Sequence, residues 1–131
     1  MNTNGALLLI RLTALTIVIQ IALGGLLTFG FISPEAHIVM GFTVYAVAIA
    51  TLVLVFMNKY SLNFLKRMAF GMVVLLTGQI FLGFVTLATG SYLLAYFHLL
   101  LAIAIFGLAV SETFVANMSY KRAKQGIANE S

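Results

Sequence analysis

The stretch Gln20-Ile21-Ala22-Leu23-Gly24 returns in the second half of the chain as Gln79-Ile80-Phe81-Leu82-Gly83. An apolar segment with one histidine near its start follows each copy, and these residues, His37 and His98, are the only histidines. The pattern predicts two similar helical hairpins that each offer one imidazole. The repeat covers about residues 10–57 and 69–115.

The composition is that of a membrane protein. Of 131 residues, 63% are hydrophobic and 8% are charged, and the mean hydropathy is +1.13. A helix needs about 20 apolar residues to cross a bilayer, where only helices and closed barrels satisfy their backbone. The apolar runs lack the period of two that is typical of strands. We therefore expect one all-α domain over residues 1–131, a four-transmembrane-helix bundle made of two hairpins, with spans at about 8–32, 36–57, 66–89 and 93–115.

The basic residues indicate an orientation. All seven fall on one side of this topology, and the positive-inside rule then places both termini in the cytoplasm. We expect a multi-pass protein of a prokaryotic cell membrane, with His37 and His98 near the outer face. The net charge of +4 fits this topology and contact with membrane lipid, and it does not indicate nucleic-acid binding. The basic residues are Arg11, Lys59, Lys66, Arg67, Lys121, Arg122 and Lys124.

Other features narrow the possible sites. Without cysteine the chain has no disulfide, no thiolate metal site and no covalent c-type haem attachment. The N-terminal segment lacks a small-residue cleavage site, so we expect it to be retained as a span. The polar tail 119–131 is expected to fray. Glu112 is expected to pair with Arg11, Lys66 or the tail.

The two histidines have two interpretations. A single histidine near a membrane interface is often a polar residue among the headgroups. Two histidines at matching places in a repeat favour haem binding, because bis-histidine coordination takes one imidazole from each side of the ring. Two nitrogens without a carboxylate or thiolate make a poor zinc site. We expect one haem per chain, of b-type or o/a-type, with His37 and His98 as its metal ligands.

Small residues near each histidine predict space for a cofactor. Gly41 and Ala102 come four residues after the histidines, and Tyr45 and Phe106 come eight after. These positions share one helix face, so each histidine has a clear space below it that an aromatic ring closes. Gly24 and Gly83 in the repeated motif are expected to let a backbone or a cofactor come close.

Three further polar residues are candidates. Gln20 and Gln79 are amides in apolar helices and must be hydrogen-bonded, either to another helix across the pseudo-twofold axis or towards the cofactor. Glu35 follows Pro34 at a predicted helix start. It is either an acid favoured by the helix dipole or a catalytic carboxylate that handles protons at the cofactor edge.

The sequence resembles the heme A synthase family over about residues 10–112. The family has a glutamine followed by I-L-G-G or I-x-L-G, similar to Gln20–Gly25 and Gln79–Gly83, and its H-L-L-L-A motif matches His98–Ala102. Larger members have eight spans, and this chain matches one half, as compact members do. The resemblance implies haem ligation by His37 and His98 and oxidation of the heme O methyl group to the formyl group of heme A.

The chain departs from the family near the first histidine. Glu35 stands two residues before His37 instead of three, Ile38 replaces a common arginine, and the loop cysteines are absent. These changes favour an alternative, a minimal electron-transfer cytochrome b or respiratory-complex subunit; a third possibility is a structural membrane subunit without a cofactor. Expected partners are an electron donor (a quinone or a redox protein), a respiratory oxidase complex, or a second copy in a homodimer that restores eight helices.

Overall fold

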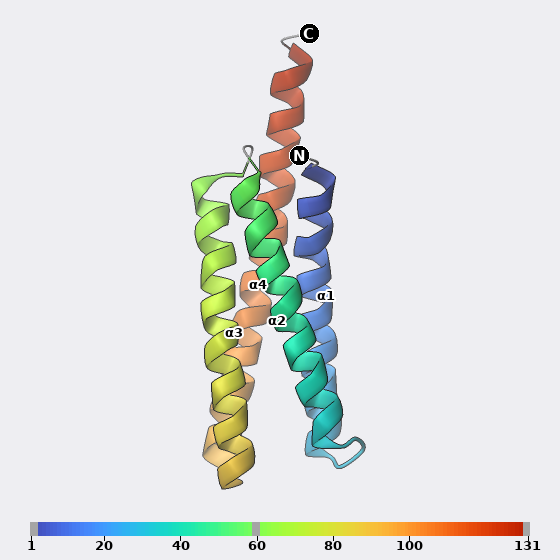
Figure 1. The fold of residues 1–131 in the computed structure, drawn as a ribbon, viewed down its shortest axis with the longest axis vertical. Helices are drawn as coiled ribbons and strands as arrows, with labels where there is room; N and C mark the ends of the chain where they lie inside the picture. The colour runs from blue at the N-terminus through green and yellow to red at the C-terminus, as the bar shows by residue number, and fades with distance from the viewer. Residues whose placement is uncertain (1–2, 59–60, 130–131) are drawn as a thin grey trace.

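The predicted fold class is confirmed. The computed structural model describes residues 3–58 and 61–129, which form a bundle of long helices (Figure 1). Each helix is long and apolar enough to cross a membrane, and the described residues contain no strand. The protein is therefore an all-α, multi-pass membrane protein. Its helices are α1 (Thr3–Thr28), α2 (Pro34–Met57), α3 (Asn63–Thr89) and α4 (Tyr92–Asn129).

Glycines end the first helix of each hairpin. The N–H of Phe31 donates to the carbonyl of Leu26 at 2.9 Å around Gly30, whose φ of 74° is left-handed. This is the capping pattern that stops a helix at a residue without Cβ, so α1 ends earlier than the predicted residue 32. Gly90, with φ 62°, ends α3 in the same way and donates to Thr86 at 2.9 Å.

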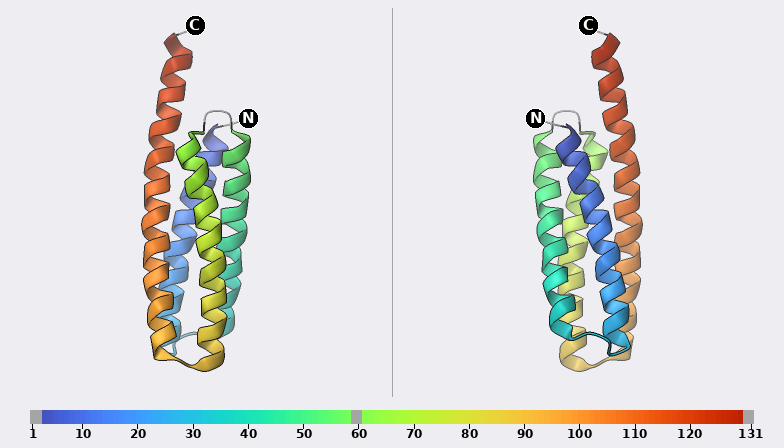
Figure 2. Two further views of the ribbon diagram at one scale, coloured as in Figure 1. Left: turned by 90° about the vertical axis from the view of Figure 1, so that its left-hand side faces the viewer. Right: turned by 90° about the vertical axis from the view of Figure 1, so that its right-hand side faces the viewer.

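The fourth helix is longer than predicted. It continues to Asn129 instead of ending near residue 115, and it extends past the other helices (Figure 2). Residues 119–129, which were expected to fray, belong to α4 in the structure. A physical reason is local packing: Tyr120 is buried in a hydrophobic cluster, and its hydroxyl lies 3.0 Å from the Ser61 hydroxyl.

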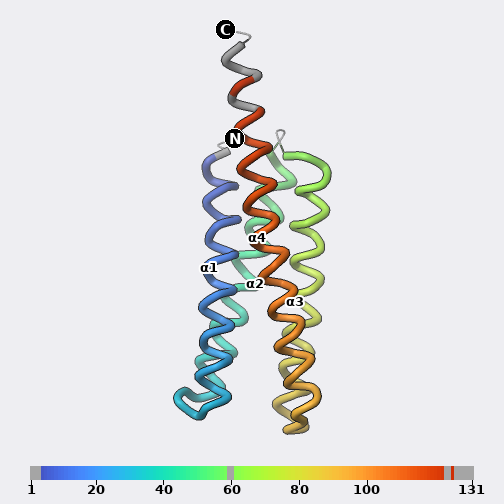
Figure 3. Tube along the Cα trace, turned by 180° about the vertical axis from the view of Figure 1, so that it is seen from behind, coloured from blue at the N-terminus to red at the C-terminus, as the bar shows by residue number. Residues whose placement is uncertain are grey.

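The helices follow one another around the bundle. Within the described residues α1 and α3 each contact both α2 and α4, whereas α1 and α3, and likewise α2 and α4, are diagonal pairs without backbone contact. Both termini lie at one end with the α2–α3 connection, and the α1–α2 and α3–α4 turns lie at the other (Figures 1 and 3). Even numbers of spans require this placement of the termini.

The buried core occupies only part of the bundle. Among the described residues, every buried side chain lies in the half that carries the termini, which we call the terminal half. The opposite half, comprising residues 18–43 and 77–104 and called the loop half, contains no buried side chain. The two hairpins diverge towards the loop half (Figures 1 and 3). The chain is thus tightly packed at one end and loosely packed at the other.

A polar layer divides the core of the terminal half. Thr13 of α1 and Thr51 of α2 are buried, and their hydroxyls lie 2.9 Å apart. Glu112 of α4 corresponds to Thr51 in the repeat, is 1% exposed, and lies between Ala109 and Ala116 of the two hydrophobic clusters. The repeat and the cluster boundaries therefore place all three side chains at one level of the bundle.

The expected pairing of Glu112 is wrong for both named helical partners. Arg11 instead donates from Nη2 to Oδ1 of Asn117 at 3.0 Å, and the Lys66 ammonium lies 5.9 Å from the centre of the Phe56 ring. Glu112 Oε1 is a buried oxygen that has no hydrogen-bond partner in the part of the chain that the structure describes. Its depth in the bundle keeps it away from cations that stay near the helix ends.

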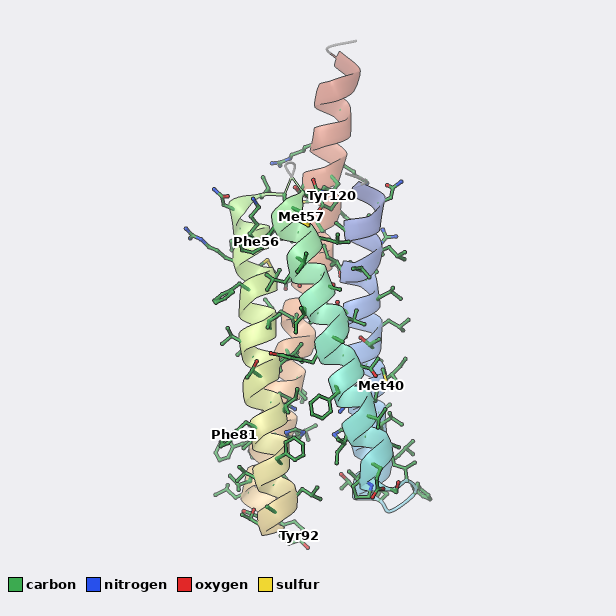
Figure 4. The ribbon with its side chains drawn as sticks, viewed as in Figure 1. Met40, Phe56, Met57, Phe81, Tyr92 and Tyr120 are labelled. Atoms are coloured by element: carbon green, nitrogen blue, oxygen red, sulfur yellow. The ribbon has the colours of Figure 1, made fainter. Side chains whose placement is uncertain are left out.

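Exposed aromatic residues mark both ends of the helices. Figure 4 shows Tyr92 at the loop end and Phe56 at the opposite end. Tyr92 is 92% exposed, and Phe29 and Phe31 in the α1–α2 turn are also strongly exposed. Tyrosine and tryptophan concentrate at the interfaces of a membrane, so the exposed Tyr92 at the loop end fits an interfacial position.

Candidate functional site

The repeated histidines meet across the bundle. His37 lies in the second turn of α2 and His98 in the second turn of α4, on diagonal helices of the loop half. Their ring centres are 6.2 Å apart, and the ring planes meet at 66°. Both residues are half-buried. The only two imidazoles of the chain therefore face each other where the described side chains leave the bundle loosely packed.

The repeated glutamines hold the histidines. Gln20 Nε2 donates to the carbonyl oxygen of His37 at 3.0 Å and lies 3.1 Å from Nε2 of its ring. Gln79 makes the same two contacts with His98, at 2.9 and 3.2 Å. Each glutamine thus binds the histidine of its own hairpin. The interhelical bond that the sequence left open exists, but it runs within a hairpin and not across the pseudo-twofold axis.

These contacts decide the tautomer of each imidazole. Because the amide nitrogen of Gln20 must face the His37 carbonyl, it also presents an N–H to His37 Nε2, which must accept. The ring proton of a neutral imidazole then lies on Nδ1. The same reasoning applies to Gln79 and His98. The hydrogen positions are assigned from this network, since the carbonyl allows only one orientation of the amide.

Each half of the site keeps two polar atoms without a partner. His37 Nδ1 and Gln20 Oε1 are buried and have no hydrogen-bond partner among the described residues, and the same is true of His98 Nδ1 and Gln79 Oε1. Buried polar atoms are nearly always satisfied in folded proteins. Four unsatisfied atoms in one small region indicate a site that is completed by another group.

The repeated glycines make room for the imidazoles. A Cβ on Gly24 would lie 3.1 Å from Cε1 of His37, and one on Gly83 would lie 3.0 Å from Cε1 of His98. Both distances are shorter than ordinary contacts, so a side chain at either position pushes the ring aside. The expected close approach at these glycines is therefore present, and the group that approaches is the histidine ring.

The space at Gly41, which was expected to hold a cofactor, contains a glutamine side chain. A Cβ on Gly41 would lie 3.1 Å from Nε2 of Gln20, so this space holds the glutamine amide. Ala102, its counterpart in α4, is half-buried. Tyr45 and Phe106, the predicted floor, pack against the hydrophobic cluster of the terminal half. The floor of the loop half is therefore aromatic on both sides.

Glu35 lies at the edge of this arrangement. It is exposed in the first turn of α2, behind Pro34 at the helix start. An acid at this position is favoured by the helix dipole. The hydrogen bonds of the His37 ring and carbonyl come from Gln20. The fold thus places Glu35 near the surface of the loop end and the glutamine next to the imidazole.

Two contacts across α2 and α3 were missed by the sequence analysis. The rings of Phe42 and Phe84 are 6.3 Å apart, and Tyr45 Oη lies 3.1 Å from Thr77 Oγ1. The repeat places Ile103 and Gly25, then Phe106 and Val18, at the matching positions of α4 and α1. Those residue types form neither an aromatic pair nor a hydrogen bond. This difference between the repeats was the signal that could have revealed the contacts.

The ligand set suits few metal sites. Within the residues that the structure describes, no three histidine, cysteine, aspartate or glutamate side chains are grouped closely enough to hold a metal ion. The two imidazoles are therefore the candidate donors that lie close together in the loop half, with Glu35 exposed at its surface. Comparisons with protein-family models, with curated proteins and with solved structures gave no match.

Proposed function

We propose that the protein binds one haem between its two hairpins, with His37 and His98 as axial ligands. The observation that carries this proposal is the 6.2 Å separation of the two ring centres across the bundle. A bond from a metal to an imidazole nitrogen is about 2 Å long, so two imidazoles on opposite sides of one metal have centres roughly 6 Å apart. The observed separation matches this spacing, and both rings would turn from the glutamines of their own hairpins to direct Nε2 at one iron.

The donor set also fits a haem better than a bare ion. A porphyrin supplies four of the six iron ligands, so two histidines complete the coordination without a third protein ligand. Nε2 is the unprotonated nitrogen of each imidazole and would bind the iron once the glutamine amide turns away from it. Nδ1, which carries the proton, has no partner in the described structure and is left to donate to another group. The absence of cysteine from the sequence restricts the haem to non-covalent attachment.

The surrounding residues have supporting roles in this proposal. In the haem-free protein Gln20 and Gln79 keep Nε2 of each ring unprotonated, which is the state in which that nitrogen can bind iron. Gly24 and Gly83 let the rings approach α1 and α3. The loosely packed loop half, closed below by Tyr45 and Phe106, provides an apolar environment for a flat macrocycle.

Electron transfer is the activity that this ligand set supports best. A bound haem supplies one-electron redox chemistry. Histidines on both axial positions leave no open coordination site, which suits an electron-transfer cytochrome of the b type. The surface position of Glu35 supports the same choice, since Gln20 occupies the place beside the His37 ring. A membrane quinone or a redox protein is the proposed electron partner.

Heme A synthase activity is a second candidate, supported by the family resemblance and by Glu35 near the start of α2. In this candidate heme O is the substrate, and Glu35 accepts a proton at the loop end of the bundle. Co-expression with a heme O synthase, followed by extraction of the haems, separates the two activities. Recovery of heme A supports the second candidate, and recovery of unmodified haem alone leaves electron transfer.

The orientation belongs to the same proposal. Arg11, Lys66, Arg67, Lys121 and Arg122 all lie in the terminal half, whereas Lys59 lies outside the described residues, as does the side chain of Lys124. The positive-inside rule then supports cytoplasmic termini and a haem near the outer face of a prokaryotic membrane. A homodimer that restores eight helices remains part of the proposal.

An absorption spectrum tests haem binding. The purified protein, supplied with haem and reduced, should show the sharp α-band of a low-spin six-coordinate haem. His37→Ala and His98→Ala should each lose this band, whereas Met40→Leu, which changes a half-buried neighbour in α2, should keep it. A wild-type protein that binds no haem would refute the proposal, as would a low-spin spectrum unchanged in both histidine variants.

A further inference from the structure

A second region of the bundle combines an open surface cavity with two basic side chains that have no acidic neighbour among the described residues. A cavity of about 550 Å³ lies between α2 and α3 at the terminal end of the bundle. It is lined by one residue of α2 and four of α3, namely Phe56, Asn63, Lys66, Arg67 and Phe70. The cavity lies in the terminal half of the bundle and the histidines lie in the loop half, so the cavity is independent of the proposed haem site.

The walls of this cavity are apolar and face outward. The side chains of Phe56 and Phe70 are 52% and 58% exposed on neighbouring helices. The ammonium of Lys66 lies 5.9 Å from the centre of the Phe56 ring, so one cation is already held against an aromatic face. An occupant with an apolar portion can therefore lie between two rings while its polar end reaches Lys66 and Arg67.

The electrostatics of the cavity favour an anion. The first turn of α3, which the structure describes in full, contains no acid, and its N-cap residue Leu62 makes no side-chain capping bond. The helix N-terminus, Lys66 and Arg67 are thus positive together, although a helix start normally favours acids. Of the acids within the described residues, Glu35 lies at the opposite end and Glu112 inside the core.

The α1–α4 interface, which is the repeat counterpart of the α2–α3 interface, does not carry the same pair of basic residues. The positions that correspond to Lys66 and Arg67 are Leu7 and Leu8 in α1. At that interface the guanidinium of Arg11 donates to Asn117 at 3.0 Å. Two cations that form no ion pair with a described acid therefore lie beside an apolar cavity on the α2–α3 side of the bundle.

We propose that this cavity binds an anionic phospholipid, with the phosphate at Lys66 and Arg67 and an acyl chain between Phe56 and Phe70. Basic pockets between transmembrane helices near the interface bind such headgroups. A soluble phosphate satisfies the cations alone, whereas a phospholipid also covers the two exposed rings. The lipid therefore matches both halves of the cavity.

Native mass spectrometry of the full chain in mild detergent tests this assignment. Phosphatidylglycerol and phosphatidylcholine with identical acyl chains are the probes. The wild-type protein should retain phosphatidylglycerol preferentially. Each cation near an anionic membrane contributes about 1 kcal/mol, so Lys66→Gln/Arg67→Gln should weaken this preference roughly 30-fold. Phe56→Ala/Phe70→Ala should weaken retention of both lipids.

A matched control removes the same charge from the same end. Lys121→Gln/Arg122→Gln changes two exposed residues of α4 outside the cavity and should keep the preference. An equal loss in both double variants would overturn the assignment, because it would show a response to net charge only. Equal retention of the two lipids by wild-type protein would also overturn it. Displacement of the lipid by an equal concentration of inorganic phosphate would instead identify a soluble-anion site.

Discussion

The imidazole rings of His37 and His98 lie with their centres 6.2 Å apart, although the helices that carry them, α2 and α4, are diagonal in the bundle. Side chains from diagonal helices meet only near the bundle axis. Each ring is supported from behind by a neighbouring helix, through Gln20 in α1 and Gln79 in α3. Both hairpins therefore present one imidazole to a common central space.

Replacing Gly83 with alanine should disturb the site. The added Cβ would lie 3.0 Å from Cε1 of His98, so the ring must shift, and this overpacking costs roughly 1–3 kcal/mol against the helix-propensity gain that alanine brings; Gly83→Ala should therefore be less stable than the control. Thermal unfolding in detergent measures this loss. The matched control is Gly78→Ala, where a Cβ meets nothing within 4 Å and alanine should stabilise α3 by about 1 kcal/mol. Equal effects at both glycines would contradict the close approach.

Replacing Gln79 with leucine should allow the His98 ring to adopt either neutral tautomer, while His37 keeps its proton on Nδ1. The variant lacks the N–H that His98 Nε2 accepts, so the ring proton no longer has to lie on Nδ1. Nitrogen-15 NMR of the haem-free protein reports the tautomer directly. His37 in the same molecule is the internal control, because Gln20 still contacts it. A predominant Nε2–H tautomer for His37 in wild-type protein would show that the glutamine does not set it.

The two hairpins should separate on the α1–α4 side, and not on the α2–α3 side, when the protein takes up haem. The α2–α3 side is joined in the loop half by Phe42 with Phe84, whereas Gly25 on α1 has open space where a side chain would begin. Gly25→Phe with Ile103→Phe supplies a matching aromatic pair, and such pairs contribute about 0.5–1.5 kcal/mol. Haem uptake, followed by stopped-flow absorbance, should slow roughly 2- to 10-fold.

The reverse exchange is the control for that prediction. Phe42→Ile with Phe84→Gly gives the α2–α3 side the residues of the α1–α4 side, and uptake should be as fast as in wild-type protein or faster. Slowing of uptake by this exchange, with no effect of the Gly25 and Ile103 substitutions, would place the separation on the other side.

Replacing Glu112 with leucine should stabilise the bundle. Its Oε1 atom is buried without a hydrogen-bond partner in the described structure, and an unsatisfied buried polar group costs roughly 1–3 kcal/mol. Thermal unfolding of Glu112→Leu in detergent should therefore begin at a higher temperature, while Glu112→Gln should change it less. A lower unfolding temperature for the leucine variant would mean that the carboxyl group makes a stabilising contact.

Hydropathy and the repeat predicted most of the fold. A long apolar segment in lipid satisfies its backbone hydrogen bonds by forming a helix. Four spans and two hairpins could therefore be predicted from composition and spacing. The helix ends could not, because they depend on particular contacts. Gly30 stops α1 through a left-handed turn, and Tyr120 extends α4 by packing against Ser61.

The site was predictable in part. The matching positions of His37 and His98 in the repeat predicted that the two side chains lie close together, and the structure places their ring centres 6.2 Å apart in an edge-on arrangement. The partners of Gln20 and Gln79 depend on how far each helix slides along its neighbour, which the sequence does not specify. The space below His37 was expected at Gly41, but the Gln20 amide lies there. The similarity between the repeats identified the two histidines as a pair. The difference between Phe84 and its counterpart Gly25 could have revealed the aromatic contact between α2 and α3.

Low-temperature electron paramagnetic resonance of the ferric protein, combined with near-infrared magnetic circular dichroism, tests the central claim most directly. These spectra identify the two axial ligands of a haem. We expect a low-spin haem with two imidazole ligands in wild-type protein, and loss of that signature in both His37→Ala and His98→Ala. A high-spin haem, a ligand other than imidazole, or a bis-imidazole signal that survives either substitution would contradict it.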